Sequence, residues 1–546
     1  MSRDVACHVL HFRSAVDDTD QPVVFSMPTL ENPSSSVACI ILSHDTLDPP
    51  TRERFIDVAV REAHRWLPSL TSSNEPVILL QPMSRGNAEG IGLAGRDLLE
   101  AIHAVQEDRQ VTLSPIYLAG VGAGATRSLQ WATLWPSRWS GVALAGAFWD
   151  ERLDPAGDSP PAWEEPARES IRPAELASNL SGLRLLIEHP WWFDGIGGTS
   201  SARQFNAMKS QLSKPGFEVS SRQHVPLLLG ATDWPSQPNE LVEWFFLKPA
   251  EPTRSMTLTA YSTRVSGHGV RLLQASGAGK PATIKRTEKE DVLSIQTTGS
   301  TDILVEPTGN KPIRLDRRRY TIGPADVRTI EGRSWIRFQH RGDRWQKISP
   351  LEPLPQAHRV HSMMDLRWDG VIFVPGTLGD DRENRTLRRL AESLARRWTT
   401  GVDSPAHDGV PHDATVRYEV IKDSDLLDEQ MSRRHLILIG TPRTNLLLAR
   451  YHGRLACEWP AHDEDDEAVD RFRFREHTYT LPDAGLVFLQ KHPDHPGQAI
   501  VVITGTTLEA IGVVDRLRLT LLPSYLLWEG PKVTTYGHWP GGLSAE

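Results

Sequence analysis

The sequence has few cysteines, no long apolar run and no surplus of basic residues. Cys7, Cys39 and Cys457 are the three cysteines among 546 residues, and they are too few and too scattered for a disulfide framework or a cysteine-based zinc site. The longest apolar runs, such as 37–42 and 141–148, are far shorter than the roughly 18 residues of a membrane helix. The net charge is −9, whereas a general nucleic-acid binder carries a basic surplus. We therefore expect neither a membrane nor a nucleic acid among its partners.

The composition is that of a folded protein. Hydrophobic residues make up 39% and charged residues 24%, which is enough apolar surface for a real core. The length suggests three or four domains at about 150 residues each. Residues 1–5 lack a charged region followed by an apolar core, so we expect no signal peptide, and a soluble, cytoplasmic protein is favoured.

Residues 1–250 alternate short apolar runs with helical patterns. The predicted strands are 37–42, 76–80, 116–120, 141–148 and 183–188, and the predicted helices are 51–67 and 92–106. Strands that are apolar on both faces and separated by helices imply a parallel sheet covered on each side. The fold class is therefore α/β for this part of the chain.

The rest of the chain divides in two. Residues 251–350 hold short β-branched or aromatic segments between turn residues, which predicts a β-sandwich-like module. After a proline-rich linker at 349–355, residues 360–546 resume the α/β alternation, which predicts a second, Rossmann-like α/β domain. One of its helices is predicted over 424–432, with Ser424 as its cap. Three of its strands end in Gly-Thr steps, at 376–377, 440–441 and 505–506, where open α/β sheets bind ligands. Ordinary strand-to-helix turns are the alternative interpretation.

The segment 114–125 runs from a predicted strand into a predicted helix and contains Gly120-Val-Gly122-Ala-Gly124. This spacing is that of the nucleophile elbow, G-x-S-x-G, in which a strained turn presents a serine oxygen. Here the central residue is Gly122. Glycine tolerates the positive φ of such a turn, but it offers no nucleophile.

The stretch 92–149 around this turn resembles the α/β-hydrolase fold, and within it the prolyl-oligopeptidase-like serine hydrolases. The later part of the chain resembles the C-terminal extension of some peptidase-like members of that family. The resemblance implies a catalytic triad at Gly122, Asp194 and Thr232, of which the first and last cannot serve as nucleophile and base. The aligned oxyanion loop, 41–46, lacks the His-Gly step that commonly exposes a backbone N–H. We therefore predict a catalytically degenerate member.

Several other residues are candidates for binding rather than catalysis. The adjacent Ser43, His44 and Asp45 lie at a strand end, where a capping turn is the plainer alternative to a ligand site. Trp191, Trp192 and Trp234 follow predicted strands and have flat faces suited to a sugar or an apolar ligand, although buried packing is the commoner role of tryptophan. The motif His492-Pro-Asp-His495 favours a plain loop, and the sequence predicts no metal and no cofactor. The sequence also contains two arginine clusters, one at 314–319 and one at 385–397. These arginines could pair with carboxylates, form a domain contact or bind an anionic ligand.

The leading hypothesis is a pseudo-hydrolase that acts as a binding or scaffold subunit. Its partner would be a small molecule, a glycan or a protein, and the sequence gives no indication of oligomeric state. The first alternative is an active serine hydrolase, peptidase or esterase, with displaced catalytic groups. The second is small-ligand binding at the Gly-Thr turns of the C-terminal α/β domain.

Overall fold

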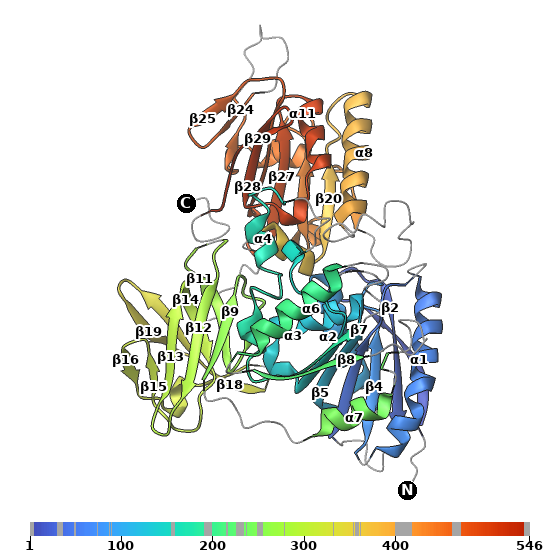
Figure 1. Cartoon of the computed structure of the whole chain (residues 1–546). Helices are drawn as coiled ribbons and strands as arrows, with labels where there is room; N and C mark the ends of the chain where they lie inside the picture. The colour runs from blue at the N-terminus through green and yellow to red at the C-terminus, as the bar shows by residue number, and fades with distance from the viewer. Residues whose placement is uncertain are drawn as a thin grey trace.

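The computed structural model describes residues 5–539 except for a set of internal positions. Those positions are 30–35, 48–50, 74, 87, 89, 154–158, 191–198, 215–216, 225–233, 236, 248–254, 278, 331, 353, 355–359, 361, 399–417 and 461–470. Its strands form sheets in three successive stretches of the chain (Figure 1).

The first stretch holds an eight-stranded sheet in the order β1-β2-β4-β3-β5-β6-β7-β8. From β4 to β8 all neighbouring strands are parallel, whereas β1 pairs antiparallel with β2 and β2 antiparallel with β4. The strands are β1 (Val5–Arg13), β2 (Asp20–Pro28), β3 (Ser36–Ser43), β4 (Val77–Pro82), β5 (Thr112–Val121), β6 (Gly141–Ala145), β7 (Arg184–Pro190) and β8 (Glu218–His224). The predicted parallel sheet is confirmed, and an antiparallel edge is added to it.

Helices cover this sheet. They are α1 (Arg52–Ser72), α2 (Leu93–Arg109), α3 (Ala123–Leu134), α4 (Glu165–Glu169), α6 (Thr199–Leu212) and α7 (Pro238–Phe246), with the 3-10 turns η1 (Pro136–Arg138), η2 (Glu151–Leu153) and η3 (Ala177–Leu180). Helix α1 begins after Thr51, whose side chain accepts the Arg54 N–H, and buries Phe55, Ala59, Ala63 and Trp66. The prediction ended this helix at residue 67, but α1 continues through Pro68 to Ser72.

The middle stretch forms two facing sheets. One contains β10 (Ser266–Gly267), β11 (Val270–Ala275), β14 (Ser300–Val305), β18 (Arg333–Arg341), β17 (Arg328–Ile330) and β19 (Arg344–Ile348). The other runs β16 (Arg318–Tyr320), β15 (Ile313–Leu315), β13 (Leu293–Thr298), β12 (Ala282–Glu288) and β9 (Ser255–Ala260), with η5 (Pro324–Asp326) in a connecting loop. Apolar residues of both sheets, such as Ile295, Leu315 and Phe338, share one core.

The last stretch builds a seven-stranded sheet in the order β21-β20-β22-β27-β26-β28-β29. Its strands are β21 (Glu419–Val420), β20 (Val371–Pro375), β22 (His435–Ile439), β27 (Ala499–Gly505), β26 (Ala484–Lys491), β28 (Tyr525–Glu529) and β29 (Lys532–Gly537). The first four of these are parallel and the rest antiparallel. A small separate sheet contains β23 (Cys457–Glu458), β24 (Phe472–Phe474) and β25 (His477–Tyr479).

Helices lie on both faces of the seven-stranded sheet. Helices α8 (Asp381–Trp398) and α11 (Leu508–Gly512) bury side chains in one core cluster, and α9 (Asp428–Arg433) and α10 (Leu446–Tyr451) in another. Three 3-10 turns, η6 (Met363–Trp368), η8 (Val513–Arg516) and η9 (Leu519–Leu521), complete this stretch. The predicted Ser424 cap is wrong: α9 begins at Asp428 after Leu427, and the Ser424 hydroxyl instead donates to Asp425.

The three stretches meet around Asp369. Its carboxylate lies 3.7 Å from Arg96 of α2 and 3.5 Å from His435 of β22, and it also pairs with Arg264 between β9 and β10. Burial raises the pKa of Asp369, but the interactions with His435 and Arg264 outweigh burial and hold that pKa well below its usual range. A cavity of about 50 Å³ lies at the same junction, with residues of all three stretches in its wall.

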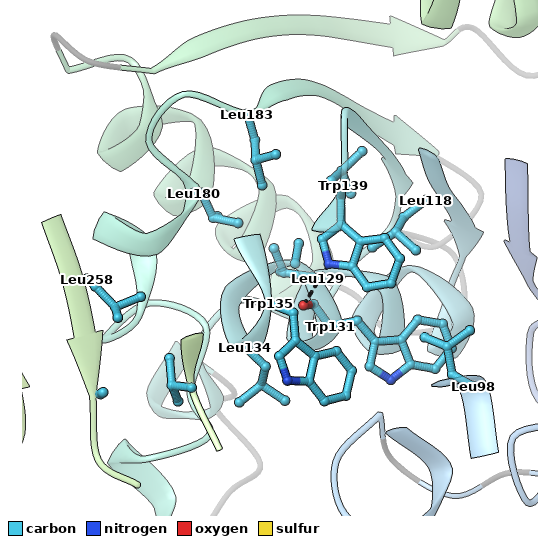
Figure 2. Close-up of a cluster of buried hydrophobic side chains, with 14 of the residues drawn as sticks. Leu98, Leu118, Leu129, Trp131, Leu134, Trp135, Trp139, Leu180, Leu183 and Leu258 are labelled. Carbon is cyan, nitrogen blue, oxygen red and sulfur yellow. Dashed lines mark hydrogen bonds between the residues drawn. The ribbon is translucent and has the colours of Figure 1, made fainter. Parts of the chain in front are cut away.

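Much of the tryptophan content is packing. Trp131, Trp135 and Trp139 lie on or just after α3, where Figure 2 shows them among leucines of neighbouring elements. The indole of Trp139 donates to the Trp131 carbonyl at 3.0 Å. Leu258 of β9 belongs to the same cluster, so the core is continuous from the eight-stranded sheet into the middle stretch.

Candidate functional site: the turn between β5 and α3

The turn between β5 and α3 has the backbone of a nucleophile elbow. Gly122 has a φ of 56° and a ψ of −120°, a conformation in which non-glycine residues are strained. Its N–H donates to the Ala145 carbonyl at the end of β6, at 2.8 Å. Side chains at Gly120 and Gly124 would overlap main-chain atoms, those of Ser43 in the case of Gly124. The three glycines therefore let α3 approach β3 closely.

A carboxylate fills the place where an elbow presents its nucleophile. A Cβ on Gly122 would overlap the carboxyl group of Asp45, which lies in the loop between β3 and α1. The Asp45 Oδ1 atom accepts the Ala123 N–H at 2.9 Å and the Thr46 N–H at 2.8 Å. Asp45 therefore caps α3, as expected for a capping turn.

These two N–H groups are the ones that form an oxyanion hole in serine hydrolases of this topology. There the hole uses the N–H of the residue after the nucleophile and one from the loop after the third strand, which here are Ala123 and Thr46. The sequence lacks the His-Gly step, yet both N–H groups converge on one oxygen. The fold is α/β-hydrolase-like.

Comparisons with known proteins found similarity to solved structures at low sequence identity. No protein-family model matches the chain, and no curated protein does. Among solved structures, the chain is similar to the fluorophosphonate-binding serine hydrolase F of Staphylococcus aureus, with 12% identity, a TM-score of 0.32, and 45% of this chain and 99% of that chain covered. The acylaminoacyl peptidase of Pyrococcus horikoshii aligns with 15% identity and a TM-score of 0.31 over 44% of this chain and 40% of its own.

Prolyl oligopeptidase B of Galerina marginata aligns over 44% of this chain and 36% of its own, with 12% identity and a TM-score of 0.28. Similarity at this level is too low to transfer a substrate or an activity.

A buried arginine lies directly behind the α/β-hydrolase-like elbow. Arg127 of α3 donates from Nε to the Ser43 hydroxyl at 3.1 Å and from Nη1 to the Gly86 carbonyl at 2.9 Å, and Nη2 donates to the His44 carbonyl. Burial lowers the pKa of Arg127 to about 10, while the negative charge of Asp45 raises it. The Asp45 carboxylate therefore partly balances the charge of a guanidinium that donates its hydrogen bonds to a hydroxyl and to backbone carbonyls.

Ser43 and His44 both face this arginine. Both are buried, and the His44 imidazole lies within hydrogen-bond distance of the Met83 carbonyl, at 3.0 Å from Nε2, and of Arg127 Nη2, at 3.2 Å from Nδ1. Burial, reinforced by the Arg127 charge, lowers the pKa of His44 to about 3, so the ring is neutral at physiological pH. The structure brings Ser43, His44 and Asp45 to one place, but with the first two turned inward and Asp45 turned to the elbow.

The other predicted site residues have different outcomes. Trp234 is 5% exposed and its indole donates to Glu188 at 2.5 Å, an arrangement that matches the packing alternative, and ligand binding by Trp234 stays a prediction. Asp194, Thr232, Trp191 and Trp192 lie outside the described residues. Arg127 was not predicted as a site residue from the sequence. It is the only charged residue of α3, and a single charge near the start of a helix that follows an elbow could have indicated it.

Buried polar side chains bind backbone groups at or next to two of the Gly-Thr turns of the seven-stranded sheet, those at 376–377 and 440–441. Asp423 is 3% exposed and accepts the Thr377 hydroxyl at 2.5 Å, the Thr377 N–H at 3.2 Å and the Leu446 N–H at 2.6 Å. Asn445 caps α10 and donates to the carbonyls of Val374 and Ile439. Binding of a ligand at these turns stays a prediction.

Within the part of the chain that the structure describes, no group of three or more His, Cys, Asp or Glu side chains is placed to hold a metal ion. At the His492-Pro-Asp-His495 loop, the His492 Nδ1 accepts the N–H groups of Asp494 and His495, and Asp494 pairs with Arg450 and Arg454. No described helix is both long and apolar enough to cross a membrane.

Proposed function

We propose that this protein is a serine-hydrolase-derived binding or scaffold subunit whose elbow no longer supports hydrolysis. The proposal includes three domains, near residues 1–250, 251–350 and 360–546, of the α/β-hydrolase-like, β-sandwich-like and Rossmann-like kinds. The observation that carries the proposal is the Asp45 carboxylate at the elbow, on the N–H groups of Ala123 and Thr46 and over the Cα of Gly122.

Two physical arguments support the loss of catalysis. Acyl transfer by this route needs a hydroxyl with an imidazole that takes its proton, and glycine supplies no hydroxyl. The tetrahedral intermediate carries an oxyanion that must be stabilised by the two N–H groups, and the carboxylate that holds them would repel it. The hydroxyl one turn further along, Thr126, donates to the Gly122 carbonyl at 3.2 Å and accepts the Phe148 N–H at 2.9 Å.

Labelling with a fluorophosphonate probe and hydrolysis of an activated ester such as p-nitrophenyl acetate test the proposal. We expect no serine-specific label and no turnover above that of the heat-denatured chain. The alternative function, an active hydrolase with displaced groups, predicts a labelled serine that peptide mapping locates. A mapped serine or clear turnover would overturn our proposal.

A further inference from the structure

One face of the five-stranded sheet in the middle stretch is polar and free of acidic residues. Because Leu258, Ile284, Ile295 and Leu315 are buried in the core, the alternate positions of their strands face outward. These outward positions are Ser255, Thr257 and Thr259 on β9, Thr283, Lys285 and Thr287 on β12, Ser294, Gln296 and Thr298 on β13, Arg314 on β15 and Arg319 on β16. We name this set the cationic face.

The exposed end of the cationic face carries two arginines directly opposite each other. Arg314 and Arg319 are register partners in the antiparallel pair β15–β16, and Ser294 is the parallel register partner of Arg314. Both arginines, Lys285 and Gln296 are exposed. Like charges opposite each other across two strands are destabilising. Among the described residues, no carboxylate lies within ion-pair distance of Arg314 or Arg319, so the predicted pairing with carboxylates is not found for these two.

Protection of a sheet edge explains only part of this arrangement. A charged residue on an edge strand opposes pairing with other chains, which accounts for Arg319 on β16, the edge strand of this sheet. It does not account for Arg314, which lies on β15, one strand further in. Figure 1 shows that β15 and β16 lie at the end of their sheet that points away from the eight-stranded sheet, so neither arginine serves the contact between the two stretches.

We propose that the cationic face binds an anionic polysaccharide. Guanidinium groups match the planar geometry of carboxylate and sulfate, and an acid between Arg314 and Arg319 would remove their mutual repulsion. The hydroxyl and amide side chains next to them can donate to and accept from sugar hydroxyls. The outward positions include no aromatic residue on which an unpaired base could stack, so a glycan fits this face better than a single-stranded nucleic acid. The proposal holds whether or not the elbow at Gly122 supports hydrolysis.

Binding of four polymers to the full chain tests this assignment. Polygalacturonate supplies carboxylates, dextran sulfate supplies sulfates, neutral dextran supplies neither, and duplex DNA supplies phosphates. We expect at least one of the two anionic polysaccharides to bind at low salt, to weaken as salt rises, and to bind more tightly than DNA, while neutral dextran does not bind. Binding of polygalacturonate indicates that the face accepts carboxylates, and binding of dextran sulfate indicates that it accepts sulfates.

Two charge-reversal variants decide whether the cationic face is responsible. We expect the double variant R314E/R319E to weaken binding by about tenfold or more. R385E/R389E changes the net charge equally on exposed positions of α8 and should leave affinity within about twofold. Equal loss in both variants, no binding of either anionic polysaccharide, or tighter binding of DNA would overturn the proposal. The variant R314Q/R319Q removes charge without reversing it. We expect it to bind the polysaccharide more weakly while its circular dichroism spectrum stays that of the unchanged chain, which separates lost binding from lost folding.

Discussion

At two strand ends in this molecule, an aspartate from the loop after a neighbouring strand accepts backbone N–H groups of the turn. At the end of β5, Asp45 from the loop after β3 accepts the first N–H of α3. At the end of β20, Asp423 from the loop after β21 accepts the Thr377 N–H, and it also accepts the first N–H of α10. In both sheets, the strand that precedes the turn and the strand that precedes the aspartate are hydrogen-bonded neighbours: β5 with β3, and β20 with β21.

The difference between the two turns is instructive. Asp423 is almost fully buried and holds three donors, so it is part of the framework of its sheet. Asp45 is half-buried, holds two N–H groups with one oxygen, and lies against a glycine of positive φ with a buried arginine behind it. The same device therefore stabilises one turn and, on our proposal, replaces the chemistry of the other.

Removing the framework carboxylate should have the largest effect. Asp423→Ala leaves the N–H groups of Thr377 and Leu446 and the Thr377 hydroxyl without their buried acceptor, and we expect a loss of about 4 kcal/mol. Calorimetry of the full chain should show one transition shifted down, and hydrogen exchange should assign it to β20 and β22. Asp425→Ala, two residues away and exposed, is the control and should change stability by less than about 0.5 kcal/mol. A shift no larger than that of the control would contradict the framework role.

The crowded elbow offers the next test. Gly122→Ala places a Cβ on the Asp45 carboxyl group at a φ of 56°, and we expect a loss of about 2 to 3 kcal/mol. In the Asp45→Ala background this cost should fall by about 1 kcal/mol or more, because the carboxyl group is gone. Chemical denaturation of the four members of the cycle measures the coupling.

Gly342→Ala is the control for adding a Cβ at a positive φ where no neighbouring atom obstructs it. Gly342 has a φ of 65°, and a Cβ there meets nothing within 4 Å. If Gly122→Ala costs no more than Gly342→Ala, or if removing Asp45 does not relieve it, then the carboxylate does not occupy the nucleophile position.

The sequence predicted elements well where local pattern decides them. The apolar spacing placed the start of α1 within one residue, and the runs that became β3 to β7 were all found. Strands β1 and β2 were not found. Strand β1 is an edge strand of half-exposed residues, so its pairing depends on a partner more than on its own apolar run. Ser424 failed as a cap because its hydroxyl bonds Asp425 instead, a local competitor that the helix pattern does not reveal.

The candidate site shows the limit more clearly. The elbow was visible from glycine spacing, and Ser43, His44 and Asp45 were visible as a triplet. Which of the three turns toward the elbow depends on Arg127, some 80 positions away in sequence, whose guanidinium draws Ser43 and His44 inward. Such a choice is set by tertiary contacts, and no local rule encodes it.

The buried imidazole of His44, behind the elbow, should make the stability of the protein depend on pH in mild acid. The pKa of His44 is lowered to about 3 in the folded chain, whereas an unfolded histidine titrates near about 6.5. As pH falls below that value the unfolded state gains the proton first, so the stability contributed by neutral His44 is complete above about pH 6.5 and is lost as pH falls toward 3. Between about pH 7 and pH 5.5 this loss is about 1.3 kcal/mol. His44→Gln should abolish that share of the pH dependence, while His103→Gln, at an exposed position of α2, should retain it. Denaturation at the two pH values checks this, and an unchanged pH dependence in His44→Gln would mean that the ring is accessible to protons in the folded state and that the packing around Arg127 is looser than described.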